Sequence, residues 1–382
     1  MLKYYIEVII RNLLKIFYIL PVKKQILFES FNGKSVSCNP YYIYKEFEKE
    51  CYKVKIIWTY NKEIPVILQN KKIKIVRFHS LSWLFASMQS KVIINNDSFG
   101  LWVPYRKNQI LINTWHGGGA YKKVGNSDNS FIGNKSEYLK NQYFSKITTY
   151  FISSCNVFTK VIAESFGISE HKFLEIGMPR NDIFFNKNEV IAADKKVRTV
   201  YSLDENDYIV LYAPTFRGSA RNCVFNNMLD FNELKNTICK LYKRNVIIMY
   251  RGHHLMKNNL DAKLIDIDAT SYVDMQELLC SADMLITDYS SCMWDFSFTE
   301  KPCILYTPDI DDYILSRGFY TEPITWGFPI AKNNFELKKI IEEFDLVSYK
   351  NNLHKNKEYF NNFEKGIASR YVYKIVKDNI DL

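Results

Sequence analysis

The stretch 109-QILINTWHGGG-119 joins an apolar, strand-like run to one histidine and three consecutive glycines. Short apolar runs of this kind are typical of buried strands in parallel sheets. Glycine lacks a Cβ atom, so the backbone after the run can take positive φ angles and approach a ligand closely. The stretch therefore predicts a buried strand that ends in a ligand-binding loop.

Similar runs recur along the whole chain and alternate with amphipathic segments such as 81–89 and 156–167. The strands expected in the first half are 25–31, 53–60, 73–78, 91–96, 109–115, 149–154 and 172–177. Those expected in the second half are 207–214, 245–250, 263–268, 283–289 and 303–308. Strands that alternate with helices form βαβ units, which assemble into parallel sheets. We therefore expect an α/β protein with two doubly wound, Rossmann-like domains that face each other across a cleft.

A length of 382 residues corresponds to about two domains. The polar and charged interval 186–207 is the expected link between them. The expected parts are an N-terminal helix (1–24), a first α/β domain (25–190), a second α/β domain (191–350) and C-terminal helices that cross back to the first domain (351–382).

The N-terminal segment combines a charged stripe with many apolar residues. Lys3, Glu7, Arg11 and Lys15 recur at every fourth position, which places them on one side of a helix. No apolar run approaches the ~20 residues that span a bilayer, and no signal-peptide cleavage pattern follows. The segment predicts a helix that lies in the membrane interface, and a helix that docks on its own domain is the alternative.

The formal net charge of +10 favours anionic partners, namely phosphorylated substrates, an acidic membrane surface or nucleic acid. The positive charge is scattered and no helix-turn-helix or RNP-like pattern occurs, so we expect no nucleic-acid partner. The eight cysteines form no CxxC pair, and the sequence has no Walker A, GxGxxG or metal-ligand motif. We therefore expect neither a metal ion nor a bound cofactor.

The first candidate site residue follows the strand quoted above. Ligands of open parallel sheets bind at the carboxyl ends of the strands. His116 stands at such an end and is followed by Gly117 and Gly118. A histidine placed there accepts a proton from a substrate hydroxyl near neutral pH. We predict that His116 is a catalytic base beside an acceptor loop, and a histidine satisfied in the core is the alternative.

A second candidate site follows the run 245–250. Arg251 and His253 place positive charge and hydrogen-bond donors at this strand end. Arginine binds a phosphate through two parallel N–H groups, and histidine donates to a phosphate or to a leaving oxygen. The pattern predicts a phosphate site, and a solvated basic loop is the alternative.

A third candidate site follows the run 283–289. Asp288, Ser290 and Ser291 lie where this strand passes into a helix. The N–H groups and the dipole at a helix N-terminus favour a phosphate. Capping of the helix by the serines is the alternative.

Two further motifs complete the candidates. The motif 212-YAPTFR-217 places Thr215 and Arg217 after a strand of the second half, and 177-GMPRND-182 places Arg180 and Asn181 at the end of the first. Structural turns are the alternative for both, since Pro, Asn and Asp favour turns. Together the candidates indicate an enzyme that handles a phosphate-bearing donor between two domains.

The ordered motifs TWHGGG, GMPRND, YAPTFR, RGHH, ITDYSS, KP..LY.PD…Y and RGFY resemble those of the CDP-glycerol glycerophosphotransferases, the family of teichoic-acid polymerases and primases. The segment 28-FESFNGKSVSCNPYYIYKE-46 is similar to the opening strand of that family and the Asn-Pro-containing segment after it. The resemblance runs from about residue 26 to residue 320, and the order of the motifs is more specific than any one of them.

The resemblance implies a GT-B architecture in which the C-terminal domain holds the nucleotide donor. It implies transfer of a polyol phosphate from CDP-glycerol or CDP-ribitol to a hydroxyl of a lipid-linked glycan or growing polymer, with release of CMP. It also implies peripheral attachment to the cytoplasmic face of the cell membrane, at an anionic lipid surface. Related enzymes serve teichoic acid, capsule or other surface polysaccharides.

In this resemblance the catalytic histidines of the family fall on His116 and His253, and its serine pair falls on Ser290 and Ser291. Asp288 would bind the ribose of the donor or orient a neighbouring group.

Two departures from the family pattern concern the loops. Gly118 and Gly119 stand where the family commonly has Thr-Pro, and His254 stands where it has proline. A GT-B glycosyltransferase or epimerase that uses a nucleotide sugar remains the alternative function, and a non-catalytic membrane scaffold is a more distant one.

Overall fold

The computed structural model describes residues 1–381 apart from 70, 72, 120–121, 130–132, 216, 220–221, 225–227 and 253–261, and only the backbone of 218–219, 222–224 and 262. The chain forms two compact units. Unit 1 comprises Met1–Asp182 and Asn361–Leu382, and unit 2 comprises Ile183–Phe360. The boundaries expected from the sequence, near residues 190 and 350, therefore differ from the observed ones by about ten residues.

Unit 1 is built on a sheet of seven parallel strands in the order β3-β2-β1-β4-β5-β6-β7. They are β1 (Lys23–Glu29), β2 (Lys55–Tyr60), β3 (Lys74–Arg77), β4 (Ser90–Asn95), β5 (Ile110–Asn113), β6 (Tyr150–Ser153) and β7 (Phe173–Glu175). The chain moves outward in one direction from β1 and in the other from β4. The carboxyl ends of these two neighbours mark the switch point where ligands of doubly wound sheets bind.

The centre of this sheet forms because its strands are apolar on both faces. Ile94 of β4 lies opposite Ile112 of β5, and both are fully buried. Burial of one such side chain stabilises the fold by about 1.5–3 kcal/mol. The pairing determines where β5 ends, and therefore where the loop with His116 begins.

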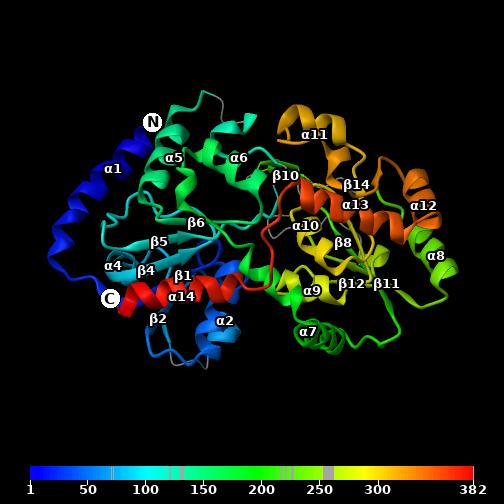
Figure 1. Cartoon of the computed structure of the whole chain (residues 1–382), viewed down its shortest axis with the longest axis horizontal. Helices are drawn as coiled ribbons and strands as arrows, with labels where there is room; N and C mark the ends of the chain where they lie inside the picture. The colour runs from blue at the N-terminus through cyan, green and yellow to red at the C-terminus, as the bar shows by residue number, and fades with distance from the viewer. Residues whose placement is uncertain are drawn as a thin grey trace. The chain divides into compact units, whose positions relative to one another are not determined.

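The helices of unit 1 are α1 (Leu2–Leu14), α2 (Cys38–Lys49), α3 (Val66–Gln69), α4 (Leu81–Gln89), α5 (Lys135–Ile147), α6 (Asn156–Phe166) and α14 (Ala368–Asp381). The last of them comes from the far end of the chain and packs on α2, as Figure 1 shows. The rings of Phe47 and Tyr373 lie 4.9 Å apart at this contact. Asp182 accepts hydrogen bonds from the amides of Ala368 (3.0 Å) and Ser369 (2.7 Å), so it caps α14.

Unit 2 is built on a sheet of six parallel strands in the order β12-β11-β8-β13-β14-β15. They are β8 (Tyr208–Ala213), β11 (Val246–Tyr250), β12 (Ile267–Asp268), β13 (Met284–Thr287), β14 (Cys303–Tyr306) and β15 (Ile330–Ala331). A separate antiparallel pair consists of β9 (Arg217–Ser219) and β10 (Asn222–Val224). The order of the six strands is that of a Rossmann-like sheet, so the prediction of two parallel α/β domains is confirmed.

The helices of unit 2 are α7 (Lys187–Val200), α8 (Phe231–Tyr242), α9 (Met275–Ser281), α10 (Cys292–Phe296), α11 (Ile310–Ser316), α12 (Asn334–Glu342) and α13 (Leu346–Tyr359). The prediction that 186–207 is a polar link was wrong. Ala193 and Val197, one turn apart, bury an apolar edge of α7, and the helix packs on α9. Of the C-terminal residues, α13 belongs to unit 2 and α14 to unit 1.

The N-terminal helix α1 lies on unit 1 with Arg11 turned toward the domain. Arg11 Nη1 donates to the carbonyl oxygen of Leu101 (3.0 Å), and the Arg11 guanidinium lies 3.7 Å from the centre of the Tyr143 ring. Most of its apolar residues are exposed, Leu2 to 75% and Leu13 to 69%. No helix within the described residues has the length and apolar content needed to cross a membrane.

Candidate active site

The carboxyl edge of the unit 1 sheet brings together residues from four neighbouring strands. His116 follows β5, Asn96 follows β4, Phe31 follows β1 and Ser154 follows β6. The rings of Phe31 and His116 lie 5.6 Å apart, and the Gly119 amide donates to Ser154 Oγ (3.3 Å). His116 therefore lies at a strand end, as predicted, and it is partly rather than fully enclosed.

The turn that carries His116 is strained. Trp115 has a φ of 52°, in the left-handed region that a bulky residue seldom adopts. Asn113 Oδ1 accepts from the Trp115 amide (2.8 Å), and Asn39 Nδ2 donates to the carbonyl oxygens of Thr114 and Trp115 (3.0 Å each). Two buried amide side chains thus hold the conformation that aims His116.

Asn96 determines the tautomer of His116. The Nδ1 atom of His116 lies 2.7 Å from the carbonyl oxygen of Asn96. A carbonyl only accepts, so Nδ1 carries the proton and Nε2 carries the free electron pair. The Asn96 side chain is itself fixed, because its Oδ1 accepts from the Phe31 amide (2.8 Å).

The electrostatic surroundings keep His116 neutral at neutral pH. Burial lowers the pKa of His116 below its usual value of 6.5, and Arg180 and Lys122 act in the same direction. The Asn96 carbonyl and Asp97 raise the pKa but do not outweigh burial. A neutral imidazole with an available Nε2 can accept a proton.

Arg180 and Asn181 were predicted to line the acceptor side, and the structure buries both: they are 3% and 1% exposed. Arg180 Nη1 donates to the His116 carbonyl oxygen (2.7 Å), and the Arg180 amide donates to Asn39 Oδ1 (3.0 Å). Asn181 Nδ2 donates to Glu364 (2.9 Å). Arg180 therefore holds the His116 loop from within, whereas Asn181 is joined to Glu364. Contact of these two residues with the acceptor stays a prediction.

The three glycines after His116 do not all need special backbone angles. Gly119 has a φ of 67°, whereas Gly117 and Gly118 have no positive φ. Gly118 is buried and Gly117 is half-buried. What these two positions offer is the absence of a side chain beside His116.

In unit 2 the predicted residues cluster around the carboxyl end of β13. Asp288 is 3% exposed and accepts hydrogen bonds from the amides of Thr215 (2.9 Å) and Tyr289 (2.5 Å). Its Oδ2 also accepts from Arg217 Nη1 (2.8 Å). Asp288 thereby joins the strand ends of β8 and β13.

Arg217 was predicted to bind the donor, and the structure pairs it with two carboxylates. Its Nη1 donates to Asp288, while Nε and Nη2 donate to Asp309, with the Nη2 bond at 2.9 Å. Burial acts to lower the pKa of Arg217, but the two carboxylates raise it above its usual value. A cavity of about 80 Å³ adjoins this cluster, between Thr215, Asp288 and Tyr306.

Arg251 lies at the end of β11 and also has partners within the protein. Its Nη1 donates to the carbonyl oxygens of Ala269 (2.7 Å) and Tyr272. Burial lowers the pKa of Arg251. The arginine therefore holds the turn that follows β12. His253 and His254, the other members of the motif, lie outside the described residues.

Ser290 and Ser291 precede α10, which has five residues. Ser291 makes no capping hydrogen bond, and Ser290 Oγ accepts a long one, 3.5 Å, from the Cys292 amide. Both serines are half-buried at the carboxyl edge of β13. Helix capping, the alternative interpretation of these serines, is therefore weak in the structure.

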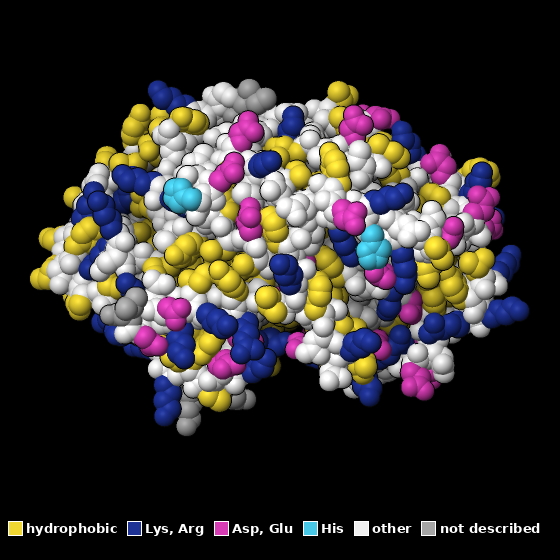
Figure 2. Space-filling view, viewed as in Figure 1, with side chains coloured by type: hydrophobic (Ala, Val, Ile, Leu, Met, Phe, Trp, Pro, Cys, Tyr) yellow, Lys and Arg dark blue, Asp and Glu magenta, His cyan; other side chains and the backbone are white. Residues whose placement is uncertain are grey.

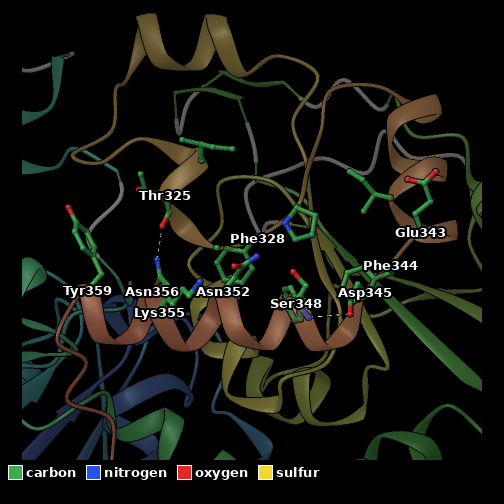
Figure 3. Close-up of a pocket in the computed structure, with 15 residues that line it drawn as sticks. Thr325, Phe328, Glu343, Phe344, Asp345, Ser348, Asn352, Lys355, Asn356 and Tyr359 are labelled. Atoms are coloured by element: carbon green, nitrogen blue, oxygen red, sulfur yellow. Dashed lines mark hydrogen bonds between the residues drawn. The ribbon is translucent and has the colours of Figure 1, made fainter.

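A cavity of about 730 Å³ lies elsewhere in unit 2, between the segment 324–329 and helices α12 and α13. Figure 3 shows Asn356 of α13 reaching across to the Thr325 carbonyl oxygen, a hydrogen bond of 2.9 Å. None of the site residues predicted from the sequence lines this cavity. Volume alone therefore does not locate the candidate site.

The sequence analysis missed several residues that belong to the candidate clusters of the two units. They are Asn39, Asn96 and Glu364 in unit 1 and Asp309 in unit 2. The strand-end rule that selected His116 also applies to Asn96, since it ends the run 91–96. Asn39 and Asp309 lie in motifs that were recognised without a role. Nothing local to Glu364 indicates its contacts with residues more than 180 positions away.

The family model for CDP-Glycerol:Poly(glycerophosphate) glycerophosphotransferase matches residues 12–378. The chain is 31% identical over 366 residues to a teichoic acid poly(glycerol phosphate) polymerase of Bacillus spizizenii, covering 92% of this chain and 91% of that protein. It is 30% identical over 340 residues to a teichoic acid poly(ribitol-phosphate) polymerase of that species, covering 86% and 52%. The chain is also 30% identical to the teichoic acid poly(glycerol phosphate) polymerase of Bacillus subtilis. That match covers 87% of this chain but only 45% of the longer protein.

Solved structures agree with these matches. The wall teichoic acid polymerase TagF superposes with a TM-score of 0.84 at 26% identity, covering 100% of this chain and 98% of that chain. The UDP-GlcNAc 2-epimerase of Methanocaldococcus jannaschii superposes with a TM-score of 0.54 at 15% identity, covering 92% and 99%. The second likeness concerns the fold alone.

Proposed function

The chain belongs to the CDP-glycerol:poly(glycerophosphate) glycerophosphotransferase family, and we propose that it transfers glycerol phosphate from CDP-glycerol to a hydroxyl of a lipid-linked or growing cell-surface polymer. Membership makes it a phosphotransferase that uses a CDP-activated polyol and forms a phosphodiester. Ribitol phosphate from CDP-ribitol is the second candidate, because a poly(ribitol-phosphate) polymerase is nearly as similar.

The observation that carries the assignment of a base is the hydrogen bond between His116 Nδ1 and the Asn96 carbonyl. With Nδ1 protonated, Nε2 accepts the proton of the acceptor hydroxyl. The hydroxyl oxygen forms a bond to the β-phosphorus as the bond from that phosphorus to the bridging oxygen breaks. CMP leaves with the electron pair of the broken bond. Gly117 and Gly118 leave room for the acceptor beside the imidazole.

The donor is assigned to unit 2. The hydroxyls of Ser290 and Ser291 at the carboxyl edge of β13 supply hydrogen-bond donors for the pyrophosphate. Arg251 supports this edge by holding the turn after β12. Thr215, Arg217 and Asp288 form one hydrogen-bonded group that shapes the neighbouring edge. His253 keeps its predicted role at the leaving oxygen, and its position lies outside the described residues.

The proposed reaction is tested by incubating the protein with CDP-glycerol or CDP-ribitol and a short lipid-linked acceptor. Mass spectrometry should show release of CMP and a new phosphodiester with at least one donor, CDP-glycerol being the one expected. Release of a nucleoside diphosphate from a nucleotide sugar, together with a new glycoside, would instead identify a glycosyltransferase. CMP release from CDP-ribitol alone would replace glycerol by ribitol in the proposal.

We propose that α1 attaches the protein peripherally to the cytoplasmic face of the cell membrane. An exposed apolar stripe supports this assignment, and its members are Leu2, Tyr5, Ile6, Ile9, Leu13 and Ile16. Figure 2 shows hydrophobic side chains with Lys and Arg along the edge of the molecule where α1 lies. A helix whose apolar side faces away from its own domain fits the boundary between head groups and acyl chains.

The membrane assignment predicts the behaviour of an α1 variant. Replacement of Ile9 and Leu13 by serine should lower binding to phosphatidylcholine vesicles at least about tenfold, because each buried side chain contributes about 1.5–3 kcal/mol. Vesicle flotation measures the bound fraction. Val200→Ser removes an apolar side chain of similar exposure from unit 2 and should leave binding unchanged. Equal binding of the α1 variant and the parent would contradict the assignment.

A further inference from the structure

A second cavity in unit 1 lies between α1, α5 and the C-terminal end of α6. Its volume is about 510 Å³, and it shares no residue with the candidate active site. The α1 residues Tyr4 and Arg11 form one wall, and α5 residues from Tyr138 to Lys146 form the opposite one. The cavity therefore opens beside the helix that carries the exposed apolar stripe.

The charged groups that line this cavity are all positive. Arg11 and Lys146 are its charged residues, and its described lining includes no aspartate or glutamate. Glu7, one turn before Arg11, does not line it. The other polar groups of the lining are tyrosine and serine hydroxyls and side-chain amides, and Leu139 and Phe166 add apolar surface. Such a composition favours an anion that accepts several hydrogen bonds.

Arg11 is held in position for such an anion. The guanidinium stacks on the Tyr143 ring at 3.7 Å, and Tyr143 in turn donates to the Val103 carbonyl oxygen (2.9 Å). One N–H of Arg11 donates to the Leu101 carbonyl oxygen (3.0 Å). A guanidinium has five N–H donors, so Leu101 and Tyr143 engage only part of the set. A planar, oriented fork of this kind suits a phosphate.

The direction of α1 indicates where the phosphate comes from. Ile9 and Leu13, on either side of Arg11 in the sequence, are 59% and 69% exposed on the outward side of the helix. When that side enters the acyl-chain region, Arg11 and the cavity lie at the level of the lipid head groups. Lys146 is exposed at the opposite wall and can reach the same level.

We propose that this cavity binds the phosphate of an anionic phospholipid head group, with Arg11 and Lys146 as the binding cations. The proposal rests on the membrane attachment assigned above and adds a lipid preference to it. The apolar stripe would provide affinity for any bilayer, and the cavity would select bilayers that carry anionic head groups. Unit 1 would thereby be seated on the membrane at one defined point.

The test uses flotation of the full-length protein with vesicles of phosphatidylcholine alone and of phosphatidylcholine mixed with phosphatidylglycerol. Arg11→Gln and Lys146→Gln should each weaken binding to the mixed vesicles about fivefold, the usual contribution of one basic residue near an anionic surface. Binding to phosphatidylcholine should stay within about twofold of the parent. Arg11→Lys should also lose affinity, since a lysine keeps the charge but not the fork.

Lys374→Gln serves as the matched control, because it removes an exposed lysine of unit 1 on α14, away from the cavity. An equal loss with this variant would show a diffuse charge effect and would overturn the proposal. Tighter binding of soluble glycerol phosphate than of the mixed vesicles would assign the cavity to free phosphate and overturn the lipid source. Absence of binding of the parent protein to either vesicle would instead overturn the membrane attachment. Lys146 is exposed, so Lys146→Gln should not disturb folding. A loss of vesicle binding that is seen with both Lys146→Gln and Arg11→Gln, but not with the control, therefore does not reflect misfolding.

Discussion

Replacement of His116 by alanine is expected to reduce the turnover number about 10²–10⁴-fold, the usual contribution of a general base. The affinity for CDP-glycerol should change less than about twofold, because the proposal places the donor on unit 2. The reason is the geometry of the imidazole: Nδ1 is bound to the Asn96 carbonyl, so the proton acceptor is Nε2 alone. CMP release measures turnover, and calorimetric titration with CDP-glycerol measures donor affinity.

The pH profile supplies a second readout for His116. Its pKa lies below 6.5, mainly because of burial, so the neutral base persists to more acidic pH than in a free histidine. Activity of the parent enzyme should therefore decline only as pH falls below 6.5.

His171→Gln is the control for His116→Ala. His171 is an exposed histidine of unit 1, and its replacement should leave turnover unchanged. Unaltered turnover in His116→Ala would exclude the base role.

Replacement of Asp288 by alanine is expected to lower the opening free energy of unit 2 by about 3 kcal/mol, because it leaves a partly buried arginine without one of its carboxylates. The value is at the lower end of the usual range, since Arg217 keeps Asp309 and its side chain is 25% exposed. Two backbone amides, those of Thr215 and Tyr289, also lose their acceptor. Hydrogen exchange followed by mass spectrometry on peptides covering β8 and β13 measures the change.

A matched control for Asp288 is Asp311→Ala, which removes an 85% exposed carboxylate whose partner Lys332 lies 3.8 Å away. Its effect should stay within about 0.5 kcal/mol, as for other exposed ion pairs. A loss below about 1 kcal/mol in Asp288→Ala would mean that solvent replaces the carboxylate, and the cluster would then have no structural role.

The sequence was sufficient to predict the class of fold and the strand that carries His116. The run 109–115 contains β5 (Ile110–Asn113), and 91–96 nearly coincides with β4 (Ser90–Asn95). Apolar content and period are local properties of these runs, so they can be read without knowledge of the partners. The short strands β9, β10 and β15 were not predicted.

Helices were likewise predictable where the apolar pattern of the segment is strong. The segment 81–89 coincides with α4, whose apolar pattern is strong and whose N-cap, Ser80, accepts from the Trp83 amide. By contrast, 186–207 looked like a link because its polar residues outnumber the apolar ones. Only the tertiary structure shows that Ala193 and Val197 are buried where α7 packs on α9 of unit 2.

Tertiary structure alone decided how the candidate residues are used. The sequence placed a histidine after a strand, but the hydrogen bond that leaves Nε2 unprotonated comes from Asn96, 20 positions away. The sequence also placed Arg180 and Arg217 in loops. Only the structure shows that Arg180 donates to the His116 carbonyl oxygen and that Arg217 pairs with two carboxylates. The sequence also did not decide which side of α1 faces outward. The contact of Arg11 with the Tyr143 ring decides it. The physical reason is the same in each case: a side chain's charge and shape are local, whereas its partner depends on which distant segment the fold brings beside it.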